Sequence, residues 1–123
     1  MSANNWLETR KRAFDIRKKT LTTSSTNTTY TAKVDKTAFE AGNVERVIDV
    51  ITTAGNGMTV TVPDGAYSGQ LLLITFLTEG SNETVTVTTT TGADFSLTAA
   101  NDYCSIEWVN ANVGWKAAHE VTT

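Results

Sequence analysis

The sequence predicts an all-β fold: a compact antiparallel β-sandwich or barrel, jelly-roll-like and of about seven or eight strands, preceded by an extended N-terminal arm with a short helix. From residue 44 onward, apolar and polar residues alternate with the period of two that is typical of half-buried strands, and turn residues interrupt this pattern at short intervals. Threonine occurs 24 times in 123 residues, against a single proline. Because its branched side chain fits a pleated surface, this composition favours strands.

The expected strands follow one another with short turns between them. Met58, Val60 and Val62 share one face of a regular alternation, and the Asn56-Gly57 dipeptide before them is typical of a tight turn. The segment 70–77 is apolar on both faces, so we expect a central strand or one that a second subunit covers. The predicted strands lie within residues 47–53, 58–62, 70–77, 84–91, 95–97, 103–109 and 113–119.

Residues 1–43 are expected to form an arm that precedes a β-sandwich domain at residues 44–123. Asn5 and Glu8 fit a capping box, which predicts a helix over about residues 6–19. On a helical wheel its apolar residues share a stripe with two arginines, which suits another protein's acidic, partly apolar surface better than this chain's own core. The residues predicted to bind that partner are Trp6, Leu7, Arg10, Lys11, Arg12, Phe14, Arg17, Lys18 and Lys19.

Two shorter features follow the predicted helix. Residues 20–32 are rich in threonine and serine and poor in apolar residues, so they are interpreted as an extended linker that could add a strand to a neighbour's sheet. A helical turn is predicted over residues 35–41, with Asp35 as its N-cap and Gly42 as its end.

Charge divides unevenly along the chain. Residues 1–20 carry six basic and two acidic side chains, a net charge of +4, whereas residues 21–123 carry four basic and eleven acidic ones, a net charge of −7. A basic end on an acidic body indicates a segment with a contact of its own. A nucleic-acid partner is not expected, because the acidic body would be repelled by phosphate.

The chemistry-bearing residues do not form a recognisable catalytic or metal-binding pattern in the sequence. His119 is the only histidine and is interpreted as a surface or interface residue, and Cys104, the only cysteine, as a small buried hydrophobic residue. A calcium site in the acidic turns stays open as an alternative. We therefore expect no enzyme, no cofactor, no disulfide and no membrane span, and a protein made in a reducing cytoplasm.

Trp108 and Trp115 flank the last predicted hairpin. Core and cross-strand packing is the simpler interpretation of this pair. The alternative is a sugar-stacking platform on an exposed face, as in a carbohydrate-binding module.

Three stretches carry a resemblance to a known group of proteins: VIDVITTAGNGMTVTVPDGAYSGQLLLITF, then GSNETVTVTTTTGADFSL, then YCSIEWVNANVGWKAAH. Their shared elements are the Pro63-Asp64-Gly65 turn that leads to Gly69-Gln70 and an apolar strand, a threonine–valine ladder, and a closing hairpin with two tryptophans. Over about residues 44–121 the chain resembles the small β-sandwich virion proteins of tailed bacteriophages.

The resemblance implies a structural role in a virus particle. It implies a capsid decoration (cement) protein that binds the outer capsid surface as a homotrimer and stabilises the shell, with the N-terminal arm docking on the major capsid protein. Its location would be the virion, after synthesis in the host cytoplasm. The alternative is a receptor- or carbohydrate-binding module of a head or tail fibre, which would use Trp108 and Trp115.

Overall fold

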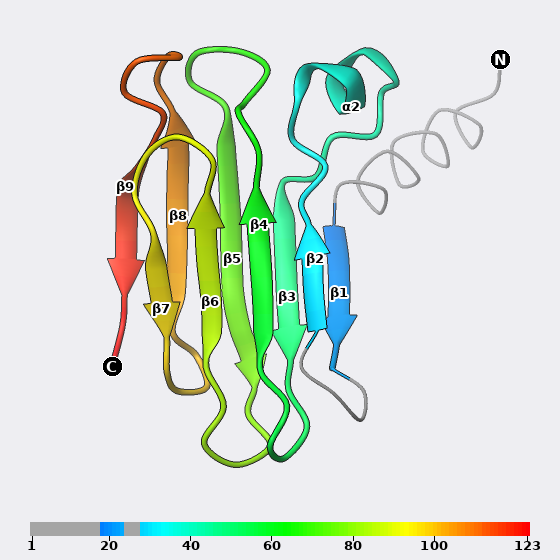
Figure 1. The fold of residues 1–123 in the computed structure, drawn as a ribbon, viewed down its shortest axis with the longest axis vertical. Helices are drawn as coiled ribbons and strands as arrows, with labels where there is room; N and C mark the ends of the chain where they lie inside the picture. Colours follow the sequence, from blue (N-terminus) through cyan, green and yellow to red (C-terminus); the bar gives the residue numbers. More distant parts are fainter. Residues whose placement is uncertain (1–17, 24–27) are drawn as a thin grey trace, which may run out of the picture.

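A computed structural model describes residues 18–23 and 28–123 and contains nine strands and one short helix in this part of the chain (Figure 1). In chain order the elements are β1 (Lys18–Thr22), β2 (Thr28–Thr31), α2 (Lys36–Glu40), β3 (Val47–Ile51), β4 (Met58–Val62), β5 (Leu71–Thr78), β6 (Val85–Thr89), β7 (Phe95–Leu97), β8 (Tyr103–Trp108) and β9 (Trp115–Val121). The all-β prediction is confirmed. The helix predicted over residues 6–19 falls almost wholly outside the described residues, and residues 18 and 19 lie in β1.

The strands form two sheets that enclose one hydrophobic core. The five-stranded sheet has the order β1-β3-β5-β8-β9, and the four-stranded sheet has the order β2-β4-β6-β7. From β1 to β6 successive strands alternate between the two sheets, so that β1, β3 and β5 are parallel neighbours in one sheet and β2, β4 and β6 in the other. The remaining pairs, β5–β8, β6–β7 and β8–β9, are antiparallel.

The prediction of an antiparallel, jelly-roll-like fold or a barrel is therefore wrong in its pairing: the sheets are mixed, and they do not close into a barrel. The turn residues were correctly expected to end strands, but most of these turns carry the chain from one sheet to the other instead of joining neighbours in one sheet. The turn after β3 illustrates this. Thr53 and Asn56 form its bridge, so its central residues are Ala54 and Gly55, the latter at a φ of 83°, two residues earlier than the predicted Asn56-Gly57 turn.

The linker interpretation of residues 20–32 is wrong where the structure describes them. Strand β1 pairs in parallel with β3, and β2 with β4, so both belong to this chain's own sheets. Their apolar content is low because both are edge strands: β1 buries only Leu21, and the end of β2 leads into the buried Ala32 and Val34. A few buried apolar side chains are thus enough to attach this region to the core.

The core is built by the alternation of side chains along each strand. In β4, Met58, Val60 and Val62 point inward and are at most 2% exposed, as the sequence predicts. Each fully buried side chain of this size stabilises the fold by about 1.5–3 kcal/mol relative to an exposed one. Gln70, also buried, bridges two loops: its Nε2 donates to the Val34 carbonyl at 2.8 Å, and its Oε1 accepts from the Ala66 amide at 2.6 Å.

The predicted helical turn at residues 35–41 is confirmed as α2. The Asp35 carboxylate accepts a hydrogen bond from the Ala38 amide at 2.9 Å, which caps the first turn. Gly42 ends the helix with a φ of 75°, a conformation that favours glycine.

Strand β5 is the middle strand of the five-stranded sheet, with β1 and β9 at the two edges (Figure 1). Leu72, Ile74 and Phe76 are fully buried in the core, while Leu71 and Leu77 are 46% and 43% exposed on the opposite face. The prediction of a central strand that is apolar on both faces is confirmed.

Candidate functional site

Most of the predicted partner-binding segment lies outside the described residues. This holds for Trp6, Leu7, Arg10, Lys11, Arg12, Phe14 and Arg17, whose role stays a prediction. The structure places the last two members of the set, Lys18 and Lys19, at the start of the edge strand β1.

Lys18 and Lys19 point to opposite sides of β1 and have separate partners. The Lys18 ammonium lies 3.2 Å from the carboxylate of Asp49 on the outer face of the five-stranded sheet. Lys19 lies over the ring of Tyr30, 5.7 Å from its centroid, and thus links the edges of the two sheets. Such partly exposed contacts are weak, worth about 1 kcal/mol or less, so neither lysine is committed to an intramolecular role.

Beneath Lys19, a hydrogen-bonded group that the sequence did not indicate closes this edge of the sandwich. The Tyr30 hydroxyl donates to the Glu45 carboxylate at 2.6 Å, and the same carboxylate accepts from the Lys33 amide at 2.8 Å. Burial, together with the hydrogen bond to Glu45 and its negative charge, raises the pKa of Tyr30. This tyrosine therefore stays neutral and acts as a structural donor rather than as an acid.

The two tryptophans belong to the core. Trp108 is 6% exposed and Trp115 is 1% exposed, and their rings meet edge to face with centroids 5.7 Å apart. The Trp115 indole N–H donates to the Pro63 carbonyl at 2.8 Å. The core-packing interpretation is confirmed, and the pair presents no open ring face on which a sugar could stack.

The single cysteine and the single histidine lie on opposite faces of the five-stranded sheet. Cys104 is fully buried, and burial, with a contribution from the charge of Glu120, raises the pKa of its thiol to about 12. The thiol is therefore unreactive at neutral pH. His119 is exposed in β9, and its ring stacks on Tyr103 with centroids 5.5 Å apart.

Two buried carboxylates organise loops. The Glu83 carboxylate accepts from the Thr52 hydroxyl at 2.7 Å and from the amides of Gly55, Gly80, Ser81 and Asn82. The Thr52 hydrogen bond, opposed by burial and helped by the amides of Ser81, Gly55 and Gly80, lowers the pKa of Glu83 to about 2. Glu83 thus joins the turn after β3 to the turn between β5 and β6.

Asp102 has the corresponding role near the C-terminus. Its carboxylate accepts from the amides of Thr98, Ala99 and Thr123, and from the Thr123 hydroxyl. Burial opposes its ionisation, but the bonds from Thr123 and the two other amides outweigh this and lower its pKa. The carboxylate therefore anchors the end of the chain, and it has no geometry that suits catalysis.

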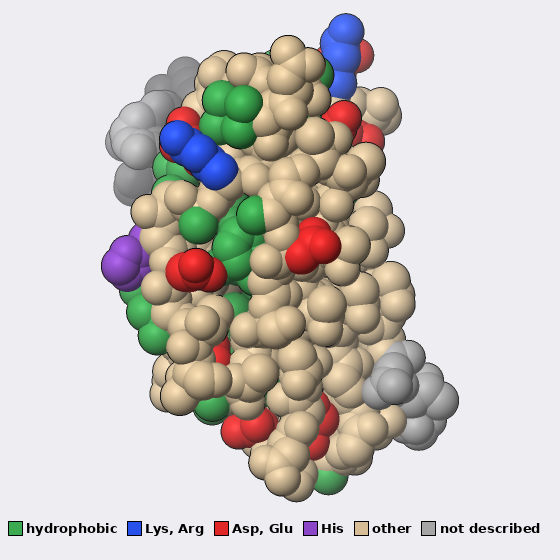
Figure 2. Space-filling model, turned by 60° about the vertical axis from the view of Figure 1, so that its left-hand side comes forward, with side chains coloured by type: hydrophobic (Ala, Val, Ile, Leu, Met, Phe, Trp, Pro, Cys, Tyr) green, Lys and Arg blue, Asp and Glu red, His purple; other side chains and the backbone are tan. Residues whose placement is uncertain are grey.

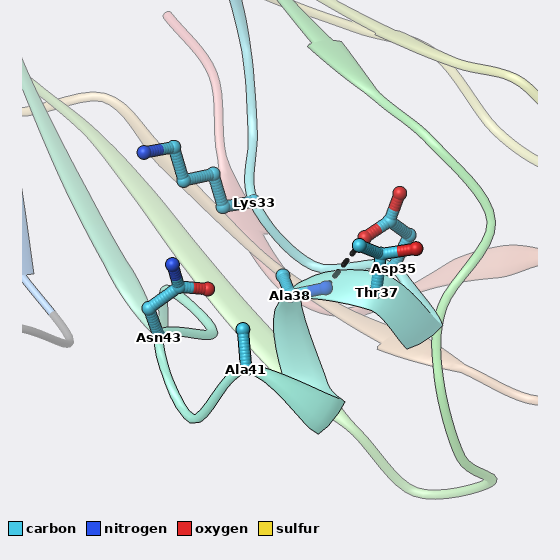
Figure 3. Close-up of a pocket in the computed structure, with 6 residues that line it drawn as sticks. All are labelled: Lys33, Asp35, Thr37, Ala38, Ala41 and Asn43. Atoms are coloured by element: carbon cyan, nitrogen blue, oxygen red, sulfur yellow. Dashed lines mark hydrogen bonds between the residues drawn. The ribbon is translucent and has the colours of Figure 1, made fainter.

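The hollow beside α2 has a volume of about 330 Å³ and is lined by Lys33, Asp35, Thr37, Ala38, Ala41 and Asn43 (Figure 3). Figure 3 shows the Asp35 carboxylate turned to the helix amide that it caps, while the Lys33 side chain extends away from it. A second hollow of about 290 Å³ lies among threonines near the start of β4 and β6. Neither hollow brings a nucleophile, a base and an oxyanion-stabilising group together.

The described residues offer neither a metal site nor a membrane-spanning helix. Among residues 18–23 and 28–123, no group of three or more His, Cys, Asp or Glu side chains is arranged to hold a metal ion. Within the same part of the chain, no helix has the length and apolar character needed to cross a membrane.

The outer faces of the two sheets are the remaining candidate surfaces. The four-stranded sheet presents threonine and serine, and Figure 2 shows a broad uncharged surface, mostly tan, on the right of the view. The five-stranded sheet instead presents exposed leucine and valine together with charged and aromatic residues. This face is the strongest candidate interaction surface among the described residues.

No protein-family model matches the chain, and no curated protein matches it in sequence.

Proposed function

We propose that this chain is a structural protein of a tailed-phage virion, a decoration protein that binds the outer capsid surface as a trimer and stabilises the shell. In this proposal the basic N-terminal segment docks on the major capsid protein. The β-sandwich body stays outside the contact and supplies rigidity.

The observation that carries the proposal is the division of charge. Residues 1–17, which precede β1, have a net charge of +2, and residues 18–123 have a net charge of −5. An acidic shell would repel the body and attract the segment, so the orientation of binding follows from the charges alone. Trp6 and Phe14 would add the aromatic anchors that protein interfaces commonly use.

The architecture supports the same conclusion. Strand β1 begins at Lys18 on the edge of the five-stranded sheet, so the basic segment joins the body at an edge and not between two core strands. Three such segments on one trimer would bind together, and each would raise the effective concentration of the others. Weak single contacts would then give durable binding.

The fibre-module alternative has lost its main support, because Trp108 and Trp115 are buried. A glycan-binding screen with the intact chain separates the two functions. A decoration protein is expected to give no signal in it.

The direct test uses shells of the phage that encodes this chain, prepared without it. The variant Trp6→Ala with Arg10→Ala is expected to lose sedimentation with the shells while its β-sheet circular dichroism stays unchanged. Binding of the wild-type chain should also weaken as salt rises, because the attraction is between exposed charges.

The matched control removes one aromatic and one cation from the body: Phe39→Ala with Lys36→Ala. Phe39 is 50% exposed, and the Lys36 and Glu40 side chains form an exposed pair at 3.8 Å, so this variant should fold and bind like wild type. Equal binding by both double variants and wild type would refute docking through the segment.

A further inference from the structure

The outer face of the five-stranded sheet carries an apolar patch centred on β5. Leu71 and Leu77 are 46% and 43% exposed, and Leu73 is half-buried between them. These side chains point outward because the alternating Leu72, Ile74 and Phe76 fill the core. A strand that is apolar on both faces is typical of a sheet covered on both sides.

The patch extends to the strands on either side of β5. Val47 of β3 lies beside Leu73, and Tyr103 of β8 lies beside Thr75, with Val121 of β9 as the next neighbour. Val121 is 42% exposed. An apolar area that spans four adjacent strands is a feature of protein–protein interfaces rather than of a surface adapted only to water.

The charges on this face balance, although the body as a whole is acidic. The described residues include six basic and eleven acidic side chains, a net charge of −5. On this face, Lys18 pairs with Asp49 on the β1–β3 side, and Glu107 lies opposite Lys116 on the β8–β9 side. This face therefore adds no local charge repulsion to the contact between two copies.

We infer that this face packs against further copies of the same chain, with β5 nearest a shared symmetry axis. The three-fold character of that axis rests on the proposed function. In a closed ring, the β1–β3 side of one copy meets the β8–β9 side of the next. The Lys18–Asp49 pair of one body then lies toward the Glu107–Lys116 pair of its neighbour, with the leucines of β5 at the centre.

Another copy fits this surface better than an unrelated acidic or basic partner does. Interfaces between identical subunits are more apolar than other protein interfaces, with few charges at their centre. The outward positions along β5 are Leu71, Leu73, Thr75 and Leu77, none of them charged. Each flank carries one positive and one negative side chain, so a flank of one copy can form opposite-charge contacts with a flank of the next.

The first test introduces like charges on this face. In light scattering with size-exclusion chromatography, the wild-type chain should have a mass three times its 13.3 kDa. Leu71→Glu with Leu77→Glu should reduce the mass to that of one chain. Thr61→Glu with Thr88→Glu adds the same charge to the outward face of the four-stranded sheet and should leave the assembly intact.

The second test avoids charged substitutions, so it remains informative even if the glutamate variants of the first test do not fold. Leu71→Cys places a thiol on the patch, and Val113→Cys places one at the turn before β9, where Val113 is 50% exposed. Cys104 is buried and gives a slow background. In the assembled protein the thiol from Leu71→Cys should react several-fold more slowly than that from Val113→Cys, and dilution to single chains should abolish the difference.

Three outcomes would overturn the inference: a wild-type chain that is monomeric at every concentration, a leucine variant that folds and stays assembled, or equal thiol reactivity in the assembled protein. These outcomes are distinct from failure of the proposed function. A monomer that still binds shells through Trp6 and Arg10 would overturn the shared interface and the trimer, and it would leave docking through the N-terminal segment in place. An assembled chain that binds no shell would overturn only the decoration role.

Discussion

The outer faces of the two sheets differ although the same alternation builds both. In the four-stranded sheet, the outward rows are Thr29, Thr59, Thr86 and Ser96, and then Thr31, Thr61 and Thr88, in register across the strands. None of the residues in β2, β4, β6 or β7 is Asp, Glu, Lys or Arg. In the five-stranded sheet, the outward positions include leucine, valine, isoleucine, tyrosine and balanced charges, together with threonine, serine and histidine.

The inward residues are mostly aliphatic and aromatic in both sheets, because both sheets pack against the same hydrophobic core. The outward residues reflect what lies outside. A threonine keeps a β-branched shape and gives its hydroxyl to water, which suits a face that stays wet. Leucine on the outer face of the central strand gains free energy only when something covers it.

The largest expected effect separates the two faces of β5 itself. Leu72→Ala removes a fully buried side chain and should lower the free energy of unfolding by about 2–5 kcal/mol. Leu71→Ala removes a half-exposed one and should cost no more than about 1 kcal/mol in the isolated chain. Chemical denaturation at low protein concentration measures both values.

Protein concentration then sharpens the comparison. If Leu71 lies in a contact between copies, the loss in free energy of unfolding caused by Leu71→Ala should rise with protein concentration. The loss caused by Leu72→Ala should not. Thr61→Ala is the matched substitution on the other sheet and should show no such dependence. A constant small cost at Leu71 across concentrations would mean that both outer faces are exposed to water.

An intermediate effect is expected where the two sheets share a polar group. The Glu83 carboxylate has its pKa lowered from 4.5 to about 2, chiefly by the Thr52 hydroxyl after β3. Because the pKa is lower in the folded state, its stabilisation is present above about pH 4.5 and is lost as the pH falls toward 2. Glu83→Gln should therefore be less stable than wild type at pH 7, and the difference should shrink in acid.

Thermal unfolding from pH 7 to pH 2 checks this expectation. Glu79→Gln neutralises a second carboxylate in the same loop, outside the Glu83 hydrogen-bond network, and should follow the wild-type pH profile. A Glu83→Gln curve parallel to that of wild type would mean that the carboxylate does not hold the two loops together.

The sequence was sufficient for the parts of the fold that depend on local pattern. The alternation of Met58, Val60 and Val62, the cap at Asp35 and the buried tryptophans follow from side-chain period and turn chemistry. The pairing of strands did not follow, because a turn between two strands looks the same whether it connects neighbours or crosses between sheets. Parallel pairing of β1 with β3 is a property of the whole chain path.

The sequence predicted only the central strand of the candidate surface and not the residues beside it. A strand apolar on both faces could be recognised at residues 70–77, and a covering subunit was among its explanations. What the sequence could not show is that Val47, Tyr103 and Val121 lie beside this strand, since they come from three other strands. The buried carboxylate of Glu83 was equally hidden, because its donors come from both sides of a loop–loop contact.

The smallest expected effect belongs to the threonine face. Thr59→Val with Thr61→Val exchanges two hydroxyls for methyl groups of almost the same shape, at outward positions of β4. Valine favours strands as threonine does, so the free energy of unfolding should change by no more than about 0.5 kcal/mol per site, and the solution mass should not change. The paired measurement is Leu71→Thr with Leu77→Thr, which makes the other face resemble this one and should weaken assembly without unfolding the chain. A loss above about 1 kcal/mol for the valine variant would mean that the threonine hydroxyls are engaged by more than water. The wet face of the body would then need a partner too, and the contrast between the two sheets would no longer identify which one is covered.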